Sequence, residues 1–245
     1  MSVKLIHITP LWLISNGIRY SHNNHNLSDS YWVDGMGTEC IYCGSQELEE
    51  SINKDGSTNA SICKSCGSNL QHHIGSKDFN LIKRVGFHMN HSSVLEHSLI
   101  VFDIELSTKA LLEFTRHRVG ISYTVTSSRY ALDTMGIEFE DTKDHRINTI
   151  LNNIKLEVDE LLENSSKKDF DQLAMLLPQA FIYKMQVSFN LRSLVHFLKL
   201  RTNKSAHYSI RKIAFQMIDA LPLEYQELVL LDEKIKKDYE KLRSI

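Results

Sequence analysis

An Arg-His-Arg triplet at residues 116–118 lies close to a Ser-Ser-Arg segment at residues 127–129, in a stretch rich in serine and threonine. Arginine side chains bind phosphate oxygens through paired N–H donors, and serine hydroxyls and loop amides can fill the remaining acceptor positions. As an alternative, Arg116 and Arg118 cap the C-terminus of a helix, where cations favour the helix dipole. Capping leaves Arg129 unexplained, so we favour an anion-binding site.

A second group of polar residues spans residues 91–97, with the sequence HSSVLEH. Ser92 or Ser93 could cap a helix, with Glu96 as the acid of a capping box. Histidines at both ends of the segment favour a binding role, although their spacing is not specific for a metal. Both interpretations stay open on these residues alone.

A third group, at residues 190–201, reads NLRSLVHFLKLR and combines an apolar stripe with polar residues on more than one face. The stripe has helical spacing and consists of Leu191, Leu194, Val195 and Leu198. We interpret the segment as a helix packed in a core beside a ligand. A solvated basic face is the alternative.

The four cysteines of the chain form two C-x2-C pairs separated by nineteen residues: Cys40, Cys43, Cys63 and Cys66. This spacing is typical of a zinc ribbon. Four thiolates make a closed tetrahedral shell, which is a structural zinc site rather than a catalytic one. Disulfides or free thiols are the alternative, and a reducing compartment disfavours disulfides. We predict a zinc-ribbon-like insertion at residues 38–69 within a single domain of residues 1–245.

Composition restricts the classes of function. The chain has 245 residues, 42% of them hydrophobic and 24% charged, which is typical of a globular protein with a sizeable core. Its net charge of −2 argues against a broad nucleic-acid-binding face. No uninterrupted apolar run approaches the ~18 residues of a membrane span. We expect a cytoplasmic protein that does not span a membrane.

The elements that must position these groups follow from periodicity and capping signals. Strands are predicted at residues 3–9 and 99–106, and a loop at residues 119–130. Ser107 is predicted to cap a helix at residues 108–116. Further helices are predicted at residues 11–19, 78–89, 144–164, 169–187, 190–201, 206–220 and 223–243. Strands early and helices late indicate an α+β fold.

Together the three polar groups resemble the motifs of the flavin-dependent thymidylate synthase family. That family has an RHR triplet followed by Ser-x-Arg, which resembles residues 116–118 and 127–129. Its H-x-[ST]-P-x-E-H element resembles residues 91–97, and its N-x-R-S-L-x-x-F-L-x-L-R helix resembles residues 190–201. The order agrees, and three motifs in order are far more specific than one. The cysteine segment is not part of the usual family pattern.

The resemblance implies the family's fold, with early strands, a helix-rich C-terminal half and here a small inserted cysteine module. It implies methylation of the uracil ring of dUMP to give dTMP, with methylenetetrahydrofolate as carbon donor. FAD would supply the hydride and NADPH would reduce the FAD. It also implies a homotetramer with active sites shared between subunits.

Residue roles follow from the resemblance, position by position. FAD contacts are implied for His91, Ser93, Glu96, Arg116, His117, Arg118, Asn190, Arg192 and His196. Nucleotide contacts are implied for Glu113, Arg116, Ser127, Ser128, Arg129 and Arg201. Arg201 would be the catalytic residue, because a permanently charged guanidinium can pair with the uracil and favour its ionised form.

The sequence departs from the family pattern at several positions. The spacer after the triplet is one residue longer, which predicts a bulge near Ile121. Val94, Val125 and His196 replace residues that are common in the family, and Ala174 stands where a basic residue often contacts the dUMP phosphate. These departures leave open a family variant acting on a modified pyrimidine nucleotide. The cysteine module alone supports the other alternative, a zinc-ribbon nucleic-acid-binding or scaffold protein.

Overall fold

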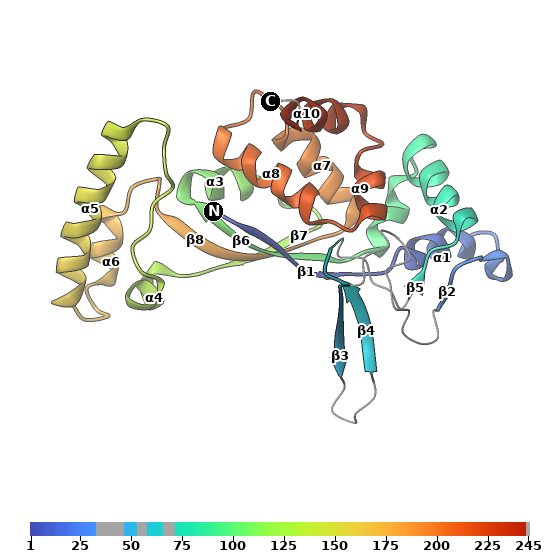
Figure 1. Ribbon diagram of the computed structural model, residues 1–245, viewed down its shortest axis with the longest axis horizontal. Helices are drawn as coiled ribbons and strands as arrows, with labels where there is room; N and C mark the ends of the chain where they lie inside the picture. Colours follow the sequence, from blue (N-terminus) through green and yellow to red (C-terminus); the bar gives the residue numbers. More distant parts are fainter. Residues whose placement is uncertain (33–46, 53–57, 66–71, 244–245) are drawn as a thin grey trace.

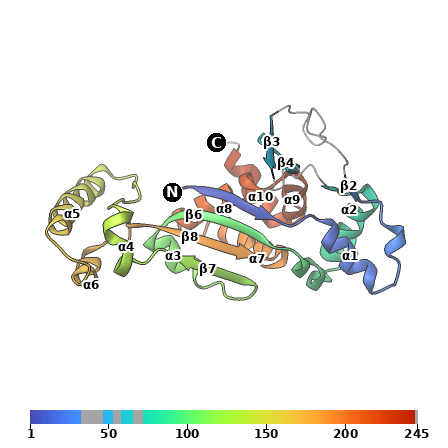
Figure 2. The same cartoon turned by 90° about the horizontal axis from the view of Figure 1, so that it is seen from below.

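The computed structural model, drawn in Figure 1, describes residues 1–32, 47–52, 58–65 and 72–243. Its main sheet has four strands in the order β1-β6-β8-β7, and every neighbouring pair is antiparallel. The strands are β1 Val3–Ile8, β6 Ile100–Ser107, β7 Ile121–Val125 and β8 Ile182–Phe189. Figure 2 shows them side by side in this order, although helices separate β6, β7 and β8 along the chain.

The two faces of this sheet differ in chemistry because side chains alternate along each strand. One face is apolar and buried, and it includes Phe102, Ile104, Met185, Val187 and Phe189. The opposite face is polar: Asp103 stands opposite Gln186, and the Gln186 amide donates to the Asp103 carboxylate at 3.1 Å. This asymmetry requires helices on one face only.

Helices α3 Thr108–Phe114, α7 Leu191–Arg201 and α8 Tyr208–Ala220 contact the strands from the same side of the sheet (Figure 1). Helix α9 Leu223–Val229 packs on α8, and α10 Glu233–Arg243 packs on α7. Side chains of these helices complete the main core, with Phe114, Leu194, Phe197, Ile213 and Ile218 fully buried. The Ser107 hydroxyl accepts from the Ala110 amide at 3.3 Å, which confirms the predicted cap of α3.

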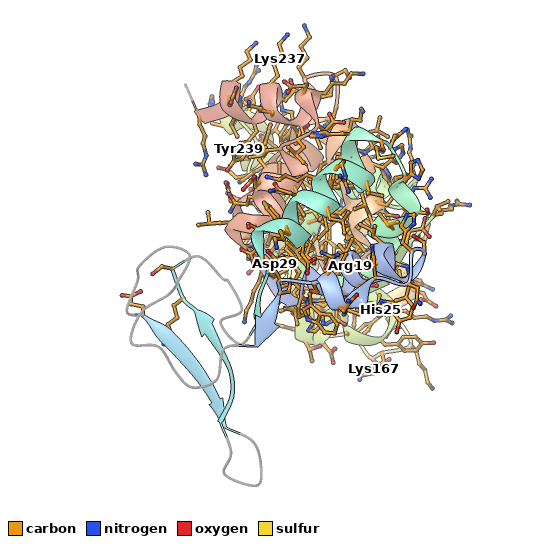
Figure 3. All side chains as sticks on the ribbon, turned by 90° about the vertical axis from the view of Figure 1, so that its right-hand side faces the viewer. Arg19, His25, Asp29, Lys167, Lys237 and Tyr239 are labelled. Atoms are coloured by element: carbon orange, nitrogen blue, oxygen red, sulfur yellow. The ribbon has the colours of Figure 1, made fainter. Side chains whose placement is uncertain are left out.

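One end of the molecule is formed by the segments before β6. They are α1 Trp12–Tyr20, η1 His25–Leu27, β2 Tyr31–Trp32, β5 His72–His73, α2 Ser76–Ile82, the π-helix η2 Lys83–His88 and the 3-10 helix η3 Ser92–His97. Buried Asp78 of α2 pairs with Arg19 and accepts from the hydroxyls of Ser28 and Ser30 at 2.5 and 2.6 Å. Figure 3 looks onto this end and labels Arg19 and, on the neighbouring segment, Asp29. The Asp29 carboxylate accepts from the first amides of α2 at 2.8 and 2.9 Å.

The other end carries α4 Ser128–Met135, α5 His145–Glu163, α6 Phe170–Leu173 and η4 Ala174–Leu176 (Figure 1). These helices enclose a smaller core of Leu132, Ile137, Val158, Phe170, Leu173 and Phe181. Phe181 immediately precedes β8, so this core is joined directly to the main sheet.

A separate hairpin of β3 Leu48–Ile52 and β4 Thr58–Cys63 extends away from the sheet (Figure 1). It falls within the predicted insertion at residues 38–69, of which residues 38–46, 53–57 and 66–69 lie outside the described residues. Within the described parts of the chain, no helix is long and apolar enough to cross a membrane.

The α+β prediction is confirmed, but several predicted elements are wrong. Residues 182–189 form a strand rather than the end of a helix at residues 169–187, which is reduced to α6 and η4. The predicted loop at residues 119–130 contains β7 and the start of α4. The C-terminal helix is two helices, because residues 230–232 interrupt it.

Candidate active site

The Arg-His-Arg triplet occupies the connection between α3 and β7. Helix α3 ends at Phe114, with Thr115 as its C-cap, so neither arginine lies within the helix. Arg116 is 71% exposed and lies 3.6 Å from the Glu113 carboxylate, whereas His117 is only 8% exposed. The triplet therefore forms a loop directly after the end of α3, with two outward arginines around a buried histidine, and Arg116 stands where the capping alternative expects a cation.

Gly120 closes this loop and sets its shape. Its φ of +68° lies in the left-handed region that favours glycine. A Cβ at this position would lie 2.2 Å from the Ser193 hydroxyl and 2.6 Å from the Asn190 side-chain amide nitrogen.

The predicted bulge near Ile121 is wrong, because β7 pairs with β8 without a register shift from Ile121 to Val125. The turn at Gly120 precedes this regular pairing.

The N-terminus of α7 packs against that turn. The Asn190 side chain caps α7 by accepting from the Ser193 amide at 2.8 Å, and the Ser193 hydroxyl donates to the Val119 carbonyl at 2.8 Å. These bonds fix the loop of the triplet to the start of the late polar helix. The helix is packed in the core, since Leu191, Ser193, Leu194, Phe197 and Leu198 are buried. Arg192 and His196 are exposed, so the helix also has the solvated basic residues that the alternative expects.

An open cleft of about 450 Å³ lies where these segments meet. Seven of the predicted cofactor residues line it: Glu96, Arg116, His117, Arg118, Asn190, Arg192 and His196. They come from η3, the triplet loop and α7, so the fold brings together parts of all three sequence groups. With three arginines and one carboxylate, this lining suits an anionic ligand.

Glu96 and Arg192 form an ion pair within the lining of this cleft, with 2.5 Å between the Glu96 carboxylate and the Arg192 guanidinium. Residues 92–97 form a 3-10 helix with no side-chain cap among its described neighbours, so the capping-box alternative is wrong. His91 and Ser93 are exposed on the same segment but do not line the cleft.

Arg201 is the last residue of α7 and contacts the triplet loop. Its Nε donates to Nε2 of His117 at 2.9 Å. One terminal nitrogen donates to the Glu113 carboxylate at 2.9 Å, and the other donates to the Glu113 carbonyl at 2.8 Å. The Arg201 and Glu113 side chains are only 13% and 15% exposed, so water screens their ion pair weakly.

His117 is held in an apolar and cationic environment. Its ring packs edge-on against Phe197 at 4.9 Å between centroids, and Phe197 packs in turn on Phe114 at 4.6 Å. Burial, the charge of Arg201 and the nearby His196 lower the pKa of His117 to about 4, while Glu113 acts in the opposite direction. The imidazole is therefore neutral at physiological pH and can accept the Arg201 hydrogen bond through Nε2.

The predicted nucleotide residues 127–129 lie elsewhere, after β7 and at the start of α4. Ser127 is the N-cap of α4, and Arg129 pairs with Asp171 of α6 at 3.3 Å. None of the three lines the cleft. Ala174 follows α6 directly, so the position that is often basic in the family stands near an acidic residue.

Four residues that also line the cleft were not predicted as site residues: Val119, Gly120, Ile121 and Ser193. A lone glycine between the triplet and an apolar alternating segment was a visible signal for a turn. Ser193 gave no such signal, because its contact with Val119 spans 74 residues of sequence.

The predicted zinc ligands cannot be placed as a group. Cys40, Cys43 and Cys66 lie outside the described residues, and Cys63 is the last residue of β4. Within residues 1–32, 47–52, 58–65 and 72–243, no three His, Cys, Asp or Glu side chains are grouped to hold a metal ion.

Comparisons with known proteins agree with the motifs. A family described as "Thymidylate synthase complementing protein" matches residues 41–223. The flavin-dependent thymidylate synthase of Wolinella succinogenes is 34% identical over 173 residues, which cover 65% of this chain and 84% of the relative. That of Helicobacter pylori is 35% identical over 173 residues, covering 63% of this chain and 82% of the relative.

A solved structure extends the similarity to the fold. The crystal structure of thymidylate synthase X from Helicobacter pylori with FAD and dUMP has a TM-score of 0.68 and 27% identity to this chain. The alignment covers 96% of this chain and 100% of the other. The chain belongs to the flavin-dependent thymidylate synthase family.

Proposed function

We propose that this chain catalyses the FAD-dependent methylation of dUMP to dTMP, with methylenetetrahydrofolate as carbon donor and NADPH as reductant. The observation that supports this most is the cleft, which is lined jointly by Glu96, the Arg-His-Arg triplet, Asn190, Arg192 and His196. These are the positions that the family motifs assign to the flavin. The Helicobacter pylori structure contains FAD and dUMP, and its similarity runs through almost the whole chain.

The residues of the cleft fit a flavin dinucleotide. Arg116, Arg118 and Arg192 supply guanidinium donors that suit a diphosphate, and Asn190 at the start of α7 offers amide and backbone groups. When bound, FAD would supply the hydride of the reaction, because no protein side chain can do so. Glu96 would contact the cofactor from η3, and the family motifs assign His91 and Ser93 of the same segment to the cofactor as well.

The protein's own contribution to the chemistry is electrostatic. Arg201 would pair with the uracil ring and stabilise its ionised form, which raises electron density at the carbon that is methylated. Ser127, Ser128 and Arg129 would contact the nucleotide, together with Arg116. In the described chain, the nucleotide loop and the cleft are formed by separate segments, which is consistent with sites completed by a neighbouring subunit.

A homotetramer is part of this proposal. Large apolar side chains are exposed close to the predicted site residues, with Val119 at 88%, Tyr130 at 69% and Met175 at 84%. Burying such side chains between subunits would be favourable, at roughly 25 cal/mol per Å² of apolar surface. Light scattering on the purified protein would measure the assembly, and a monomeric FAD-bound enzyme would contradict it.

Zinc binding by Cys40, Cys43, Cys63 and Cys66 is proposed from their spacing. A structural zinc ion would stabilise the small insertion, and the reduced thiols it requires would suit the cytoplasmic location that we propose. Metal analysis of the purified protein should find one zinc ion per chain. Chelation should lower the melting temperature before it changes FAD binding, and unchanged melting would contradict a structural role.

The flavin site is tested by the visible spectrum of the purified protein. We expect bound FAD that loses its absorbance on anaerobic addition of NADPH and recovers it after dUMP and methylenetetrahydrofolate are added. Arg201→Ala should keep the flavin spectrum and lose turnover almost completely. A protein that binds no added FAD would refute the proposal and favour the zinc-scaffold alternative.

A further inference from the structure

Arg201 is oriented by three hydrogen bonds that it donates to residues far from it in sequence. Nε donates to His117, and the two terminal nitrogens donate to the carboxylate and the carbonyl of Glu113, all within 2.9 Å. A guanidinium has five N–H donors, so two remain for a ligand. The partners are 84 and 88 residues away, one in the triplet loop and the other in α3.

We propose that His117 and Glu113 are positioning residues that act through Arg201: they fix its guanidinium so that the remaining donors face the pyrimidine base. This inference rests on the proposed function, in which Arg201 pairs with the uracil. It differs from the roles implied by the family motifs, which assign His117 to the flavin and Glu113 to the nucleotide.

The histidine can do this only in its neutral form. Nε2 accepts from Arg201, so the ring proton must be on Nδ1, and an imidazolium would have no acceptor. The charged or titratable groups facing it are Arg201 and His196 on α7 and Glu113 on α3, with Arg116 and Arg118 as its sequence neighbours. Burial beside this mostly cationic set keeps the imidazole neutral.

Fixing Arg201 in advance has a functional consequence. An arginine side chain has many rotamers, and ordering it during binding would weaken the complex. A guanidinium already held by three acceptors needs no such ordering and can stabilise charge on the base as it develops. The low exposure of Arg201 and Glu113 strengthens these contacts, because little water competes for them.

A double-mutant cycle separates a positioning role from a direct ligand contact. The FAD-loaded full-length protein is titrated with dUMP in four forms: wild type, His117→Phe, Arg201→Ala and the double variant. Phenylalanine keeps the ring packing on Phe197 but has no acceptor. We expect His117→Phe to retain FAD and to bind dUMP at least tenfold more weakly. In the Arg201→Ala background, the same substitution should cause no further loss.

If His117→Phe folds poorly, Glu113→Ala gives a second, independent cycle. Glu113→Ala should weaken dUMP binding in the wild-type background and should cause no further loss in Arg201→Ala. His117→Gln, which can still accept a hydrogen bond, should recover most of the dUMP affinity. The ultraviolet difference spectrum of bound dUMP should show an ionised base in the wild type and the Gln variant only.

Three results would overturn the inference. Equal loss of dUMP affinity with and without Arg201 would show direct contacts, and loss of FAD in folded His117→Phe would make His117 a cofactor residue. Unchanged dUMP affinity in both single variants would show that the hydrogen bonds do not matter. If the wild type with bound FAD does not bind dUMP, the proposed function fails, and this inference fails with it.

Discussion

At the scale of single residues, two of the site arginines form ion pairs that differ in how strongly water screens them. Arg201 and Glu113 form a shielded pair, whereas Arg129 and Asp171 are 64% and 58% exposed and lie 3.3 Å apart. Exposed pairs contribute only about 0–1 kcal/mol. An anionic ligand can therefore displace Asp171 from Arg129 at little cost, whereas displacing Glu113 from Arg201 would be expensive.

Asp171→Asn should strengthen dUMP binding. Removing the carboxylate frees Arg129 for the nucleotide, and the small energy of an exposed pair predicts a gain of about two- to fivefold at low salt. Calorimetric titration with dUMP measures the change. Glu240→Gln removes the same charge from α10 and should leave the affinity unchanged. Weaker binding in Asp171→Asn would show that Asp171 supports the loop instead of competing for Arg129.

The depressed pKa of His117 predicts how stability depends on pH. The ordinary pKa of histidine is 6.5 and the folded value is about 4. Between these values the unfolded chain binds a proton that the folded chain does not, so stability falls as pH is lowered from 6.5 to 4. The slope from this residue is at most about 1.4 kcal/mol per pH unit.

Urea unfolding of the wild type and of His117→Gln between pH 4 and pH 7 measures this contribution. The variant has no imidazole at this position, so its stability should fall less steeply with acid than that of the wild type. Parallel curves would show that His117 titrates normally in the folded protein.

At the scale of elements, the turn at Gly120 joins the triplet loop, β7 and α7. Gly120→Ala should disrupt the cleft, because the new Cβ would collide with Ser193 and Asn190 at a positive φ. Gly136 is a matched control, since its φ is +69° and an added Cβ would meet nothing within 4 Å. Both variants place a side chain at a positive φ, but only Gly120→Ala should lose FAD, measured by flavin absorbance. Equal FAD binding in the two variants would show that the cleft tolerates the Cβ added by Gly120→Ala.

Element prediction succeeded where a local signal decided the structure. The cap at Ser107, the helix at residues 190–201 and the first strand were all visible as capping or periodicity. Strand β8 was missed, although Pro178 could have ended the preceding helix. After it, exposed Lys184 and Gln186 alternate with buried Met185 and Val187, which is the period of a strand.

The candidate site was predicted as three separate motifs but not as an arrangement. Sequence spacing identified the triplet and the late helix. It could not show that Arg201 hydrogen-bonds His117, because that contact depends on how α3 and α7 pack on the same face of the sheet. Nor could it show that Ser127 to Arg129 lie apart from the cleft.

At the scale of the whole molecule, long-range contacts tie the C-terminal helices to the first strand. The buried Tyr225 hydroxyl of α9 donates to the Thr9 carbonyl at 2.6 Å across 216 residues, and burial raises the pKa of this tyrosine. The shift keeps the hydroxyl protonated and able to donate. This bond helps to hold α9 against the residue that follows β1, which is an edge strand of the main sheet.

Tyr225→Phe should destabilise the protein by about 0.5–1.5 kcal/mol, because the Thr9 carbonyl loses a partner at a partly buried position. FAD binding should stay intact in the folded variant, since Tyr225 does not line the cleft. Urea unfolding gives the free energy. Tyr208→Phe removes a hydroxyl from a 45% exposed side chain and should change stability little. Equal effects of the two substitutions would contradict the role given to the Thr9 bond.

The central claim is that this chain transfers a one-carbon unit to dUMP and reduces it to a methyl group. Mass spectrometry of the nucleotide product tests it most directly, with FAD, NADPH and methylenetetrahydrofolate carrying ¹³C in the transferred carbon. We predict dTMP with the label in its methyl group, formed by the wild type and not by Arg201→Ala. Unchanged dUMP in the presence of bound, reducible FAD would contradict the claim.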